Sequence, residues 1–99
     1  MSGQGNKQTL TADDTTDERS FIGPIRLSLT GTFGGGTAKL QSKDPKGVVV
    51  DVANGSFTAA TDTLFDFPVQ SVNDLKVNLS GSTTPVLAVW IQGKQVGLN

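Results

Sequence analysis

The chain has 99 residues and a formal net charge of −1, and it contains neither Cys nor His. This length is enough for one domain around one hydrophobic core. The near-neutral charge gives no electrostatic reason to expect nucleic acid or a membrane as a partner. Without Cys, disulfides and thiolate metal sites are excluded. Thr, Ser and Gly are abundant, and this composition favours strands and turns and predicts an all-β fold.

Residues 1–20 differ from the rest of the chain because they are polar and acidic. Only three of them are apolar, and four acidic residues outweigh two basic ones. Such a segment buries too little apolar surface to offset the entropy of ordering it. We therefore expect a flexible or extended N-terminal arm, which is either a loose terminus or a segment that orders on a partner. In the second case Leu10, Asp13 and Asp14 are candidate partner-binding residues.

Residues 25–41 show the clearest strand pattern of the chain. Apolar and polar residues alternate in residues 25–30 and again in residues 37–41. A period of two is typical of a strand with one buried face, because successive side chains point to opposite faces of a sheet. The glycines between the two runs can adopt the positive φ angles that a tight reversal needs. This segment is predicted to be a β-hairpin.

The remainder of the domain is predicted to consist of short strands separated by turns. Asn54 and Gly55 form the strongest two-residue hairpin signal in the sequence. Turn signals roughly every 8–12 residues predict a β-sandwich or a barrel. We expect residues 21–99 to form a single antiparallel β-sandwich or small barrel of six to eight strands, following the arm. The expected strands are residues 21–30, 33 or 36 to 41, 48–53, 56–61, 63–67, 74–80 and 86–92.

The apolar positions of these strands predict the core. Trp90 is out of phase with the apolar residues on either side of it. Either its strand is covered on both faces, or Trp90 lies on an outer face and contacts another subunit or a partner. Phe21 and Phe33 are the other candidate partner-binding residues in the domain. The expected core residues are Ile25, Leu27, Leu29, Leu40, Val48, Val50, Val52, Phe57, Phe65, Phe67, Val77, Leu79, Leu87, Val89 and Ile91.

No pattern in the sequence supports catalysis. The glycine cluster has the spacing of a phosphate-binding loop, but Thr37 stands where the Lys should be and a strand pattern follows. Nucleophilic catalysis needs a base beside Ser or Thr, and the chain has neither His nor Cys for that role. Asp51, Asp62, Asp66 and Asp74 are spread over strand ends and turns, where Asp usually caps or faces solvent. We expect no enzymatic activity, no catalytic residue, no cofactor and no metal site.

Residues 27–41 resemble a motif of small structural proteins encoded by tailed bacteriophages. In that family Leu-x-Gly-x-Phe-x-Gly-Gly-Thr-x-x-Leu-Gln often forms a hairpin, followed by a Val-x-Val strand, a Phe-Thr segment and a late alternating strand. The similarity covers residues 25–92 and is sharpest in the first hairpin. The family's Arg-Ser-x-Asp-Gly-Gly turn is replaced by Ser-Lys-Asp-Pro-Lys-Gly at residues 42–47. The later counterparts in this chain are residues 48–52, Phe57 with Thr58, and residues 75–79.

The resemblance implies a non-enzymatic virion protein, and a capsid decoration (cement) protein fits it best. Such a protein is made in the host cytoplasm, is often a homotrimer, and binds the major capsid protein on the outer surface of the head. There it stabilises contacts between capsid subunits, and several of these proteins use an N-terminal arm, which orders on binding. The alternative is a tail or fibre component that binds another virion protein or a host-surface glycan. A cellular adhesion or immunoglobulin-like interaction domain is a third possibility.

Overall fold

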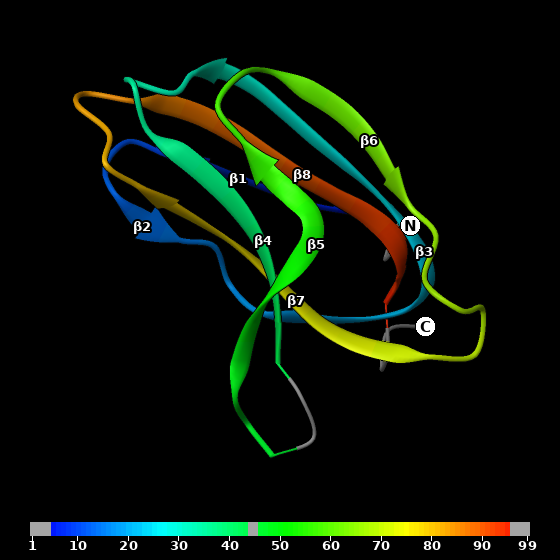
Figure 1. Cartoon of the computed structure of the whole chain (residues 1–99). Coiled ribbons are helices and arrows are strands. Elements are labelled where there is room, and N and C mark those ends of the chain that lie inside the picture. Colours follow the sequence, from blue (N-terminus) through cyan, green and yellow to red (C-terminus); the bar gives the residue numbers. More distant parts are fainter. Residues whose placement is uncertain (1–4, 44–45, 96–99) are drawn as a thin grey trace.

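The computed structural model describes residues 5–43 and 46–95, which form eight antiparallel strands and no helix. This confirms the predicted all-β class. The choice between a sandwich and a small barrel stays a prediction. The strands are β1 (Gly5–Leu10), β2 (Asp14–Thr15), β3 (Arg19–Thr32), β4 (Thr37–Lys43), β5 (Val49–Phe57), β6 (Thr61–Phe65), β7 (Val72–Ser80) and β8 (Val86–Gln95) (Figure 1).

The long strand β3 connects two rows of strands. Its first residues, from Arg19 to Ile22, pair with β7, whereas its later residues pair with β6 on one side and β8 on the other. The register against β8 shifts between Ile22 and Arg26, around Pro24. Because Pro has no N–H to give to a ladder, a change of neighbours is favoured there. One row is therefore β1-β8-β3-β6, and the other is β2-β7-β4-β5.

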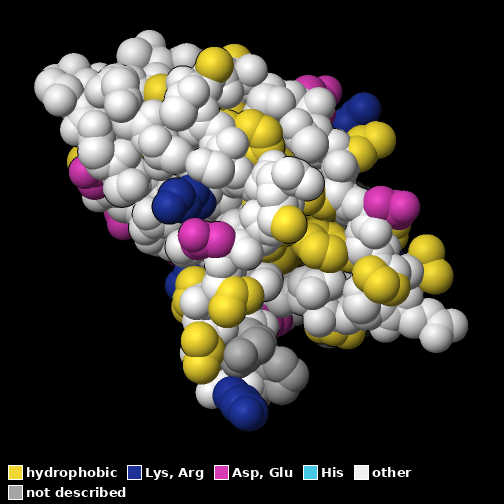
Figure 2. All heavy atoms as spheres, in the orientation of Figure 1, with side chains coloured by type: hydrophobic (Ala, Val, Ile, Leu, Met, Phe, Trp, Pro, Cys, Tyr) yellow, Lys and Arg dark blue, Asp and Glu magenta, His cyan; other side chains and the backbone are white. Residues whose placement is uncertain are grey.

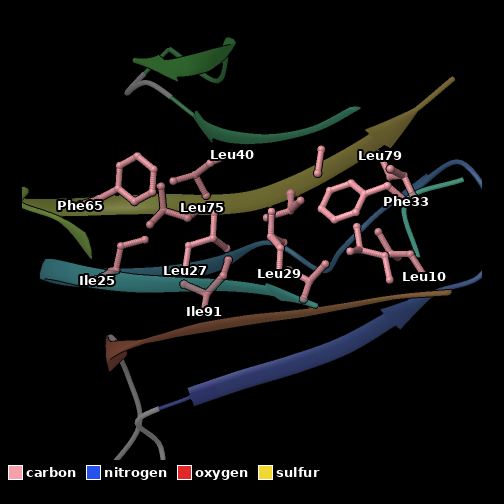
Figure 3. Packing of buried hydrophobic residues seen from close by; sticks show 14 of the residues in the cluster. Leu10, Ile25, Leu27, Leu29, Phe33, Leu40, Phe65, Leu75, Leu79 and Ile91 are labelled. Atoms are coloured by element: carbon pink, nitrogen blue, oxygen red, sulfur yellow. The ribbon is translucent and has the colours of Figure 1, made fainter. Parts of the chain in front are cut away.

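The hydrophobic core lies between these two rows. Figure 3 shows Leu27 and Leu29 of β3 and Ile91 of β8 pointing toward Leu40 of β4 and Leu75 of β7. Ten of the fifteen expected core residues are buried, and Val52, Phe57 and Phe67 pack against the core while partly buried. The buried hydrophobic residues missing from the expected set are Leu10, Phe21, Phe33, Ala38 and Leu75.

The predicted hairpin over residues 25–41 is wrong. β3 pairs with β6, β7 and β8, whereas β4 pairs with β5 and β7. The glycine segment therefore carries the chain from one row to the other. The connection from β7 to β8 also crosses between the rows, and it meets the glycine segment where the N–H of Thr83 donates to the carbonyl of Gly34 at 2.9 Å. Alternation of apolar and polar residues indicates that each run is a strand with one buried face. It does not indicate which other strand pairs with it.

The hairpin predicted at Asn54 and Gly55 is also wrong, because both residues lie inside β5. Against β4, the pairing changes from Gln41 with Asp51 to Lys39 with Ser56, so four residues of β5 oppose one residue of β4. Asn54 has a φ of 62°. The left-handed conformation that Asn adopts easily is used here in a large bulge. The separate strand predicted at residues 56–61 is absent, because residues 56–57 end β5 and residues 58–60 lie in no strand. The strand predicted at residues 63–67 corresponds to β6, which pairs with β3.

Three stretches of residues 5–20 are part of the sheet, in β1, β2 and the start of β3, which differs from the expected separate arm. β1 pairs with β8 from Gly5 opposite Gln92 to Leu10 opposite Leu87. Thr16 exchanges two hydrogen bonds with Val77, each of 2.9 Å. Backbone hydrogen bonds do not depend on side-chain type, so a polar segment can be held by a sheet edge with few apolar contacts. Residues 1–4 of the expected arm lie outside the described residues.

Candidate interaction surfaces

The six candidate partner-binding residues fall into two groups. Leu10, Phe21 and Phe33 are at most 6% exposed and belong to the core, so they do not offer a surface to a partner. Asp13, Asp14 and Trp90 are exposed. All three residues of the first group pack in the core between the two rows of strands. Only the second group remains available for contact with another molecule.

Asp13 holds the connection between β7 and β8. Its carboxylate accepts hydrogen bonds from the N–H groups of Gly81 at 3.1 Å and Ser82 at 2.9 Å, and from the hydroxyl of Ser82. The Ser82 hydroxyl, followed by its N–H, lowers the pKa of Asp13 from its usual value of 3.8. Asp14 uses one carboxylate oxygen to accept the N–H of Thr15 at 2.8 Å. Both carboxylates therefore accept backbone hydrogen bonds and still face solvent.

Trp90 lies on the outer face of β8, with 41% of its surface exposed. This resolves the alternative left open by the sequence in favour of an outer position. Residues directly opposite each other in antiparallel strands share a face of the sheet. One row of side chains therefore crosses all four strands of this part of the sheet. Its members are Lys7 of β1, Trp90 of β8, Ser28 of β3 and Asp62 of β6.

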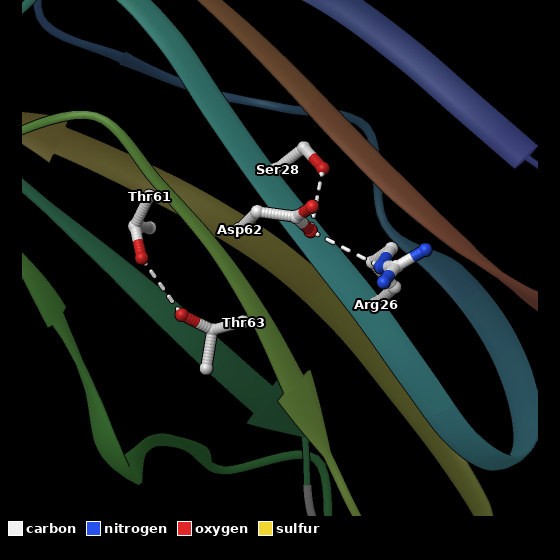
Figure 4. A network of polar contacts seen from close by, with 5 residues as sticks. All are labelled: Arg26, Ser28, Thr61, Asp62 and Thr63. Carbon is white, nitrogen blue, oxygen red and sulfur yellow. Dashed lines mark hydrogen bonds and ion pairs between the residues drawn. The ribbon is translucent and has the colours of Figure 1, made fainter.

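Ser28, which lies opposite Trp90, belongs to a polar network with Arg26 and Asp62 on the same face (Figure 4). Asp62 accepts a hydrogen bond from the hydroxyl of Ser28 at 3.1 Å, and its carboxylate lies 3.1 Å from Nε of Arg26. Both charged side chains are at least half exposed, so the ion pair contributes little to stability. It does orient Arg26 and Asp62 toward each other. Leu64 and Val86 add exposed apolar surface to this face, which we call the Trp90 face.

A second apolar surface lies at the start of β5. Val48, Val49 and Val50 are 54%, 38% and 44% exposed, although Val48 and Val50 were expected in the core. They are exposed because the β4–β5 hairpin projects beyond the facing row of strands (Figure 1). Figure 2 shows hydrophobic side chains along this hairpin and in the neighbouring part of the surface. Among the described strands β5 pairs only with β4, and its successive exposed valines make this hairpin a candidate interaction surface.

The carboxylates considered for chemistry do not converge. Asp51 accepts a hydrogen bond from Gln41 at 2.9 Å and lies 3.8 Å from Nζ of Lys39. Asp74 accepts the hydroxyl of Ser20. Within the described part of the chain, no three Asp, Glu, His or Cys residues gather into a group that could hold a metal ion. Asp51, Asp62 and Asp74 instead each have their own local partner.

The described residues include no helix that is long and apolar enough to cross a membrane.

No protein-family model, curated protein sequence or solved structure matches the chain. The resemblance of residues 27–41 to phage structural proteins therefore stays a prediction from the sequence.

Sequence reasoning missed two features of these surfaces. The three valines at residues 48–50 were assigned to a buried strand, although they follow one another without alternation and begin directly after a turn. Their position beside a turn is the signal that would have indicated exposure. Leu64 was not singled out at all, because a single apolar residue in a short run does not show which face of the strand is buried.

Proposed function

We propose that this protein is a non-enzymatic structural protein of a bacteriophage virion, and specifically a capsid decoration protein. In this proposal it binds the major capsid protein on the outer surface of the head and strengthens contacts between capsid subunits. The observation that carries the proposal is the projecting β4–β5 hairpin with its three exposed valines, in a chain whose sequence resembles phage structural proteins. A projecting apolar hairpin suits insertion into a gap between neighbouring subunits.

The energy available from this contact is modest for one copy. Complete burial of a Val side chain contributes about 1.5 kcal/mol or more. Because the three valines are roughly half exposed, their burial on the capsid would add on the order of 2 kcal/mol per copy. That corresponds to roughly a thirtyfold gain in affinity. Many copies on one head would together raise the cost of separating the subunits that they join.

The test is sedimentation of the purified protein with phage heads that have been stripped of it. We expect saturable binding at many copies per head, in a fixed ratio to the major capsid protein. The variant V48S/V50S should bind at least tenfold more weakly. L64S, which changes an even more exposed apolar residue on the Trp90 face, is the control and should bind heads as the parent protein does.

Two outcomes would overturn the proposal. Binding of only a few copies, confined to the tail vertex, would indicate a tail or fibre component. Absence of binding to heads, together with sedimentation of the protein with host-surface polysaccharide, would indicate a glycan-binding role.

A further inference from the structure

The two rows of strands end in four edge strands, which differ in length and polarity. These are β1 and β6 in one row and β2 and β5 in the other. β2 has only two residues, β1 has Lys7 near its centre, and β6 begins with the polar segment 61–63. β5 begins with Val49 and Val50, which are both exposed. Within the described part of the chain, β5 is therefore the edge strand that presents consecutive exposed apolar residues.

The open side of β5 has backbone groups that face away from β4. Val49 lies opposite Lys43 and Val50 lies opposite Ser42 in an antiparallel ladder. Residues in such a ladder alternate between those that exchange hydrogen bonds with the neighbouring strand and those whose N–H and C=O point away from it. β5 pairs only with β4 among the described strands. One of the two valines therefore directs its N–H and C=O toward the open side, where the main chain of another strand can pair with them.

The two faces of β5 define the side chains that an added strand needs. Val50 and Val52 lie on the core side, since Val52 packs against the core and alternate residues of a strand share a face. Asp51 lies on the opposite face, where its carboxylate is 3.8 Å from Nζ of Lys39 and its side chain remains 57% exposed. Between neighbouring strands, β-branched apolar pairs and opposite charges are favourable, whereas like charges are unfavourable. A segment that pairs with β5 therefore needs an apolar residue beside Val50 and is favoured by a basic residue beside Asp51.

We propose that an extended segment of the major capsid protein pairs with residues 49–52 and adds a strand beside β5. The segment places an apolar side chain next to Val50 and a basic side chain next to Asp51. A helix does not fit this site, because its own N–H and C=O groups are already bonded within the helix. The β4–β5 hairpin projects beyond the facing row, so the start of β5 is accessible to such a segment (Figure 1). The inference rests on the proposed function and specifies how the capsid protein is bound.

Proline at the open side of β5 tests the main-chain pairing. Amide hydrogen exchange of the free protein, followed by NMR, shows which of Val49 and Val50 has the faster-exchanging N–H, and that residue faces the open side. V49P or V50P, whichever changes that residue, keeps an apolar side chain but removes the outward N–H. Its binding to phage heads in the sedimentation assay should be weaker by roughly tenfold or more. The alanine variant of the same residue removes more of the side chain but keeps the N–H, so it should weaken binding less than the proline variant.

Variants of β6 and of Asp51 complete the experiment. T63P or L64P, chosen in β6 by the same exchange criterion, is the matched control for proline at an edge strand and should bind heads as the parent protein does. D51N removes the charge that attracts a basic residue of the segment, and it should weaken head binding by roughly twofold to fivefold. Far-UV circular dichroism and urea unfolding establish that each variant is folded.

The inference fails if the outward proline variant binds heads as tightly as the matching alanine variant. Weak binding by V48S/V50S in that case shows that the valine side chains alone make the contact, and the proposed function stands. Unchanged binding by D51N overturns the basic residue beside Asp51. A parent protein that sediments as a dimer without heads, and that the outward proline converts to a monomer, shows that β5 pairs with a second copy and overturns the inference. If the parent protein does not bind heads, the proposed function and the inference fail together.

Discussion

β3 and β5 are both strands rich in alternating or β-branched apolar residues, yet their burial differs. Leu27 and Leu29 of β3 are fully buried, whereas Val49 and Val50 of β5 are exposed. β3 has neighbours along both sides, while β5 pairs only with β4 among the described strands. The number of neighbouring strands, together with the row of strands that faces each residue, decides burial. Apolar composition alone does not.

The largest expected effect comes from shortening a buried side chain of β3. L27A should lower the free energy of unfolding by about 2–5 kcal/mol, because it removes transfer energy and leaves a cavity between the two rows. V50A, in the exposed part of β5, should cost less than about 1 kcal/mol. Urea unfolding of both variants measures the difference. Equal losses of unfolding free energy would show that Val50 is as buried as Leu27 and would contradict the difference between β5 and β3.

The next effect lies where the chain leaves β3 and crosses to the other row. Gly34 has a φ of 63°, and an added Cβ would meet the carbonyl oxygen of Thr83. G34A should therefore destabilise the protein by about 1–3 kcal/mol. Gly35 is the matched control, since its φ is 78° but no atom lies within 4 Å of an added Cβ. G35A should lower the free energy of unfolding by about 1 kcal/mol. If G34A lowers it by no more than G35A does, the two connections do not approach each other as closely as described.

A smaller effect is expected at Asp13, which fixes the connection beside Gly34. The pKa of Asp13 is lowered in the folded protein, first by the Ser82 hydroxyl. Its contribution to stability is therefore complete above the usual Asp pKa, and it is lost as the pH falls through the lowered folded value. D13N should remove this part of the pH dependence and be destabilising at neutral pH. Urea unfolding from pH 7 to pH 2 checks this, with D66N as control; parallel pH profiles for parent and D13N would contradict the interpretation.

The smallest effects are expected on the outer faces of the two strands. Arg26 of β3 pairs with Asp62, and Lys39 of β4 pairs with Asp51 of β5, at 3.1 Å and 3.8 Å. All four side chains are substantially exposed, so D62N and D51N should each change stability by less than about 1 kcal/mol. On their outer faces, β3 and β5 should thus respond alike to loss of an ion pair. They should differ only in how much their inner-face residues contribute to stability. A large loss in either variant would show that its ion pair has a structural role beyond orientation.

The candidate surfaces were only partly predictable from the sequence. Trp90 stood out because it breaks the phase of β8, and the phase argument correctly allowed an outer position. Leu10 and Phe33 did not stand out as core residues, because each lies outside a long alternating run. Asp13 was visible as part of a cluster of charges, but its attachment to Gly81 and Ser82 joins segments far apart in the sequence. No local pattern encodes such a contact.

The sequence by itself determined that the chain is all-β, where most strands lie, and which face of each central strand is buried. Those properties follow from local side-chain periodicity and turn chemistry. Only the tertiary structure decided which strands pair, because period two marks a buried face without naming the strand beside it. It also decided that the glycine segment at residues 31–36 crosses between rows, that Asn54 and Gly55 form a bulge, and that the valines of β5 remain exposed. Each of these depends on neighbours distant in the sequence, whose positions are fixed only when the whole sheet has formed.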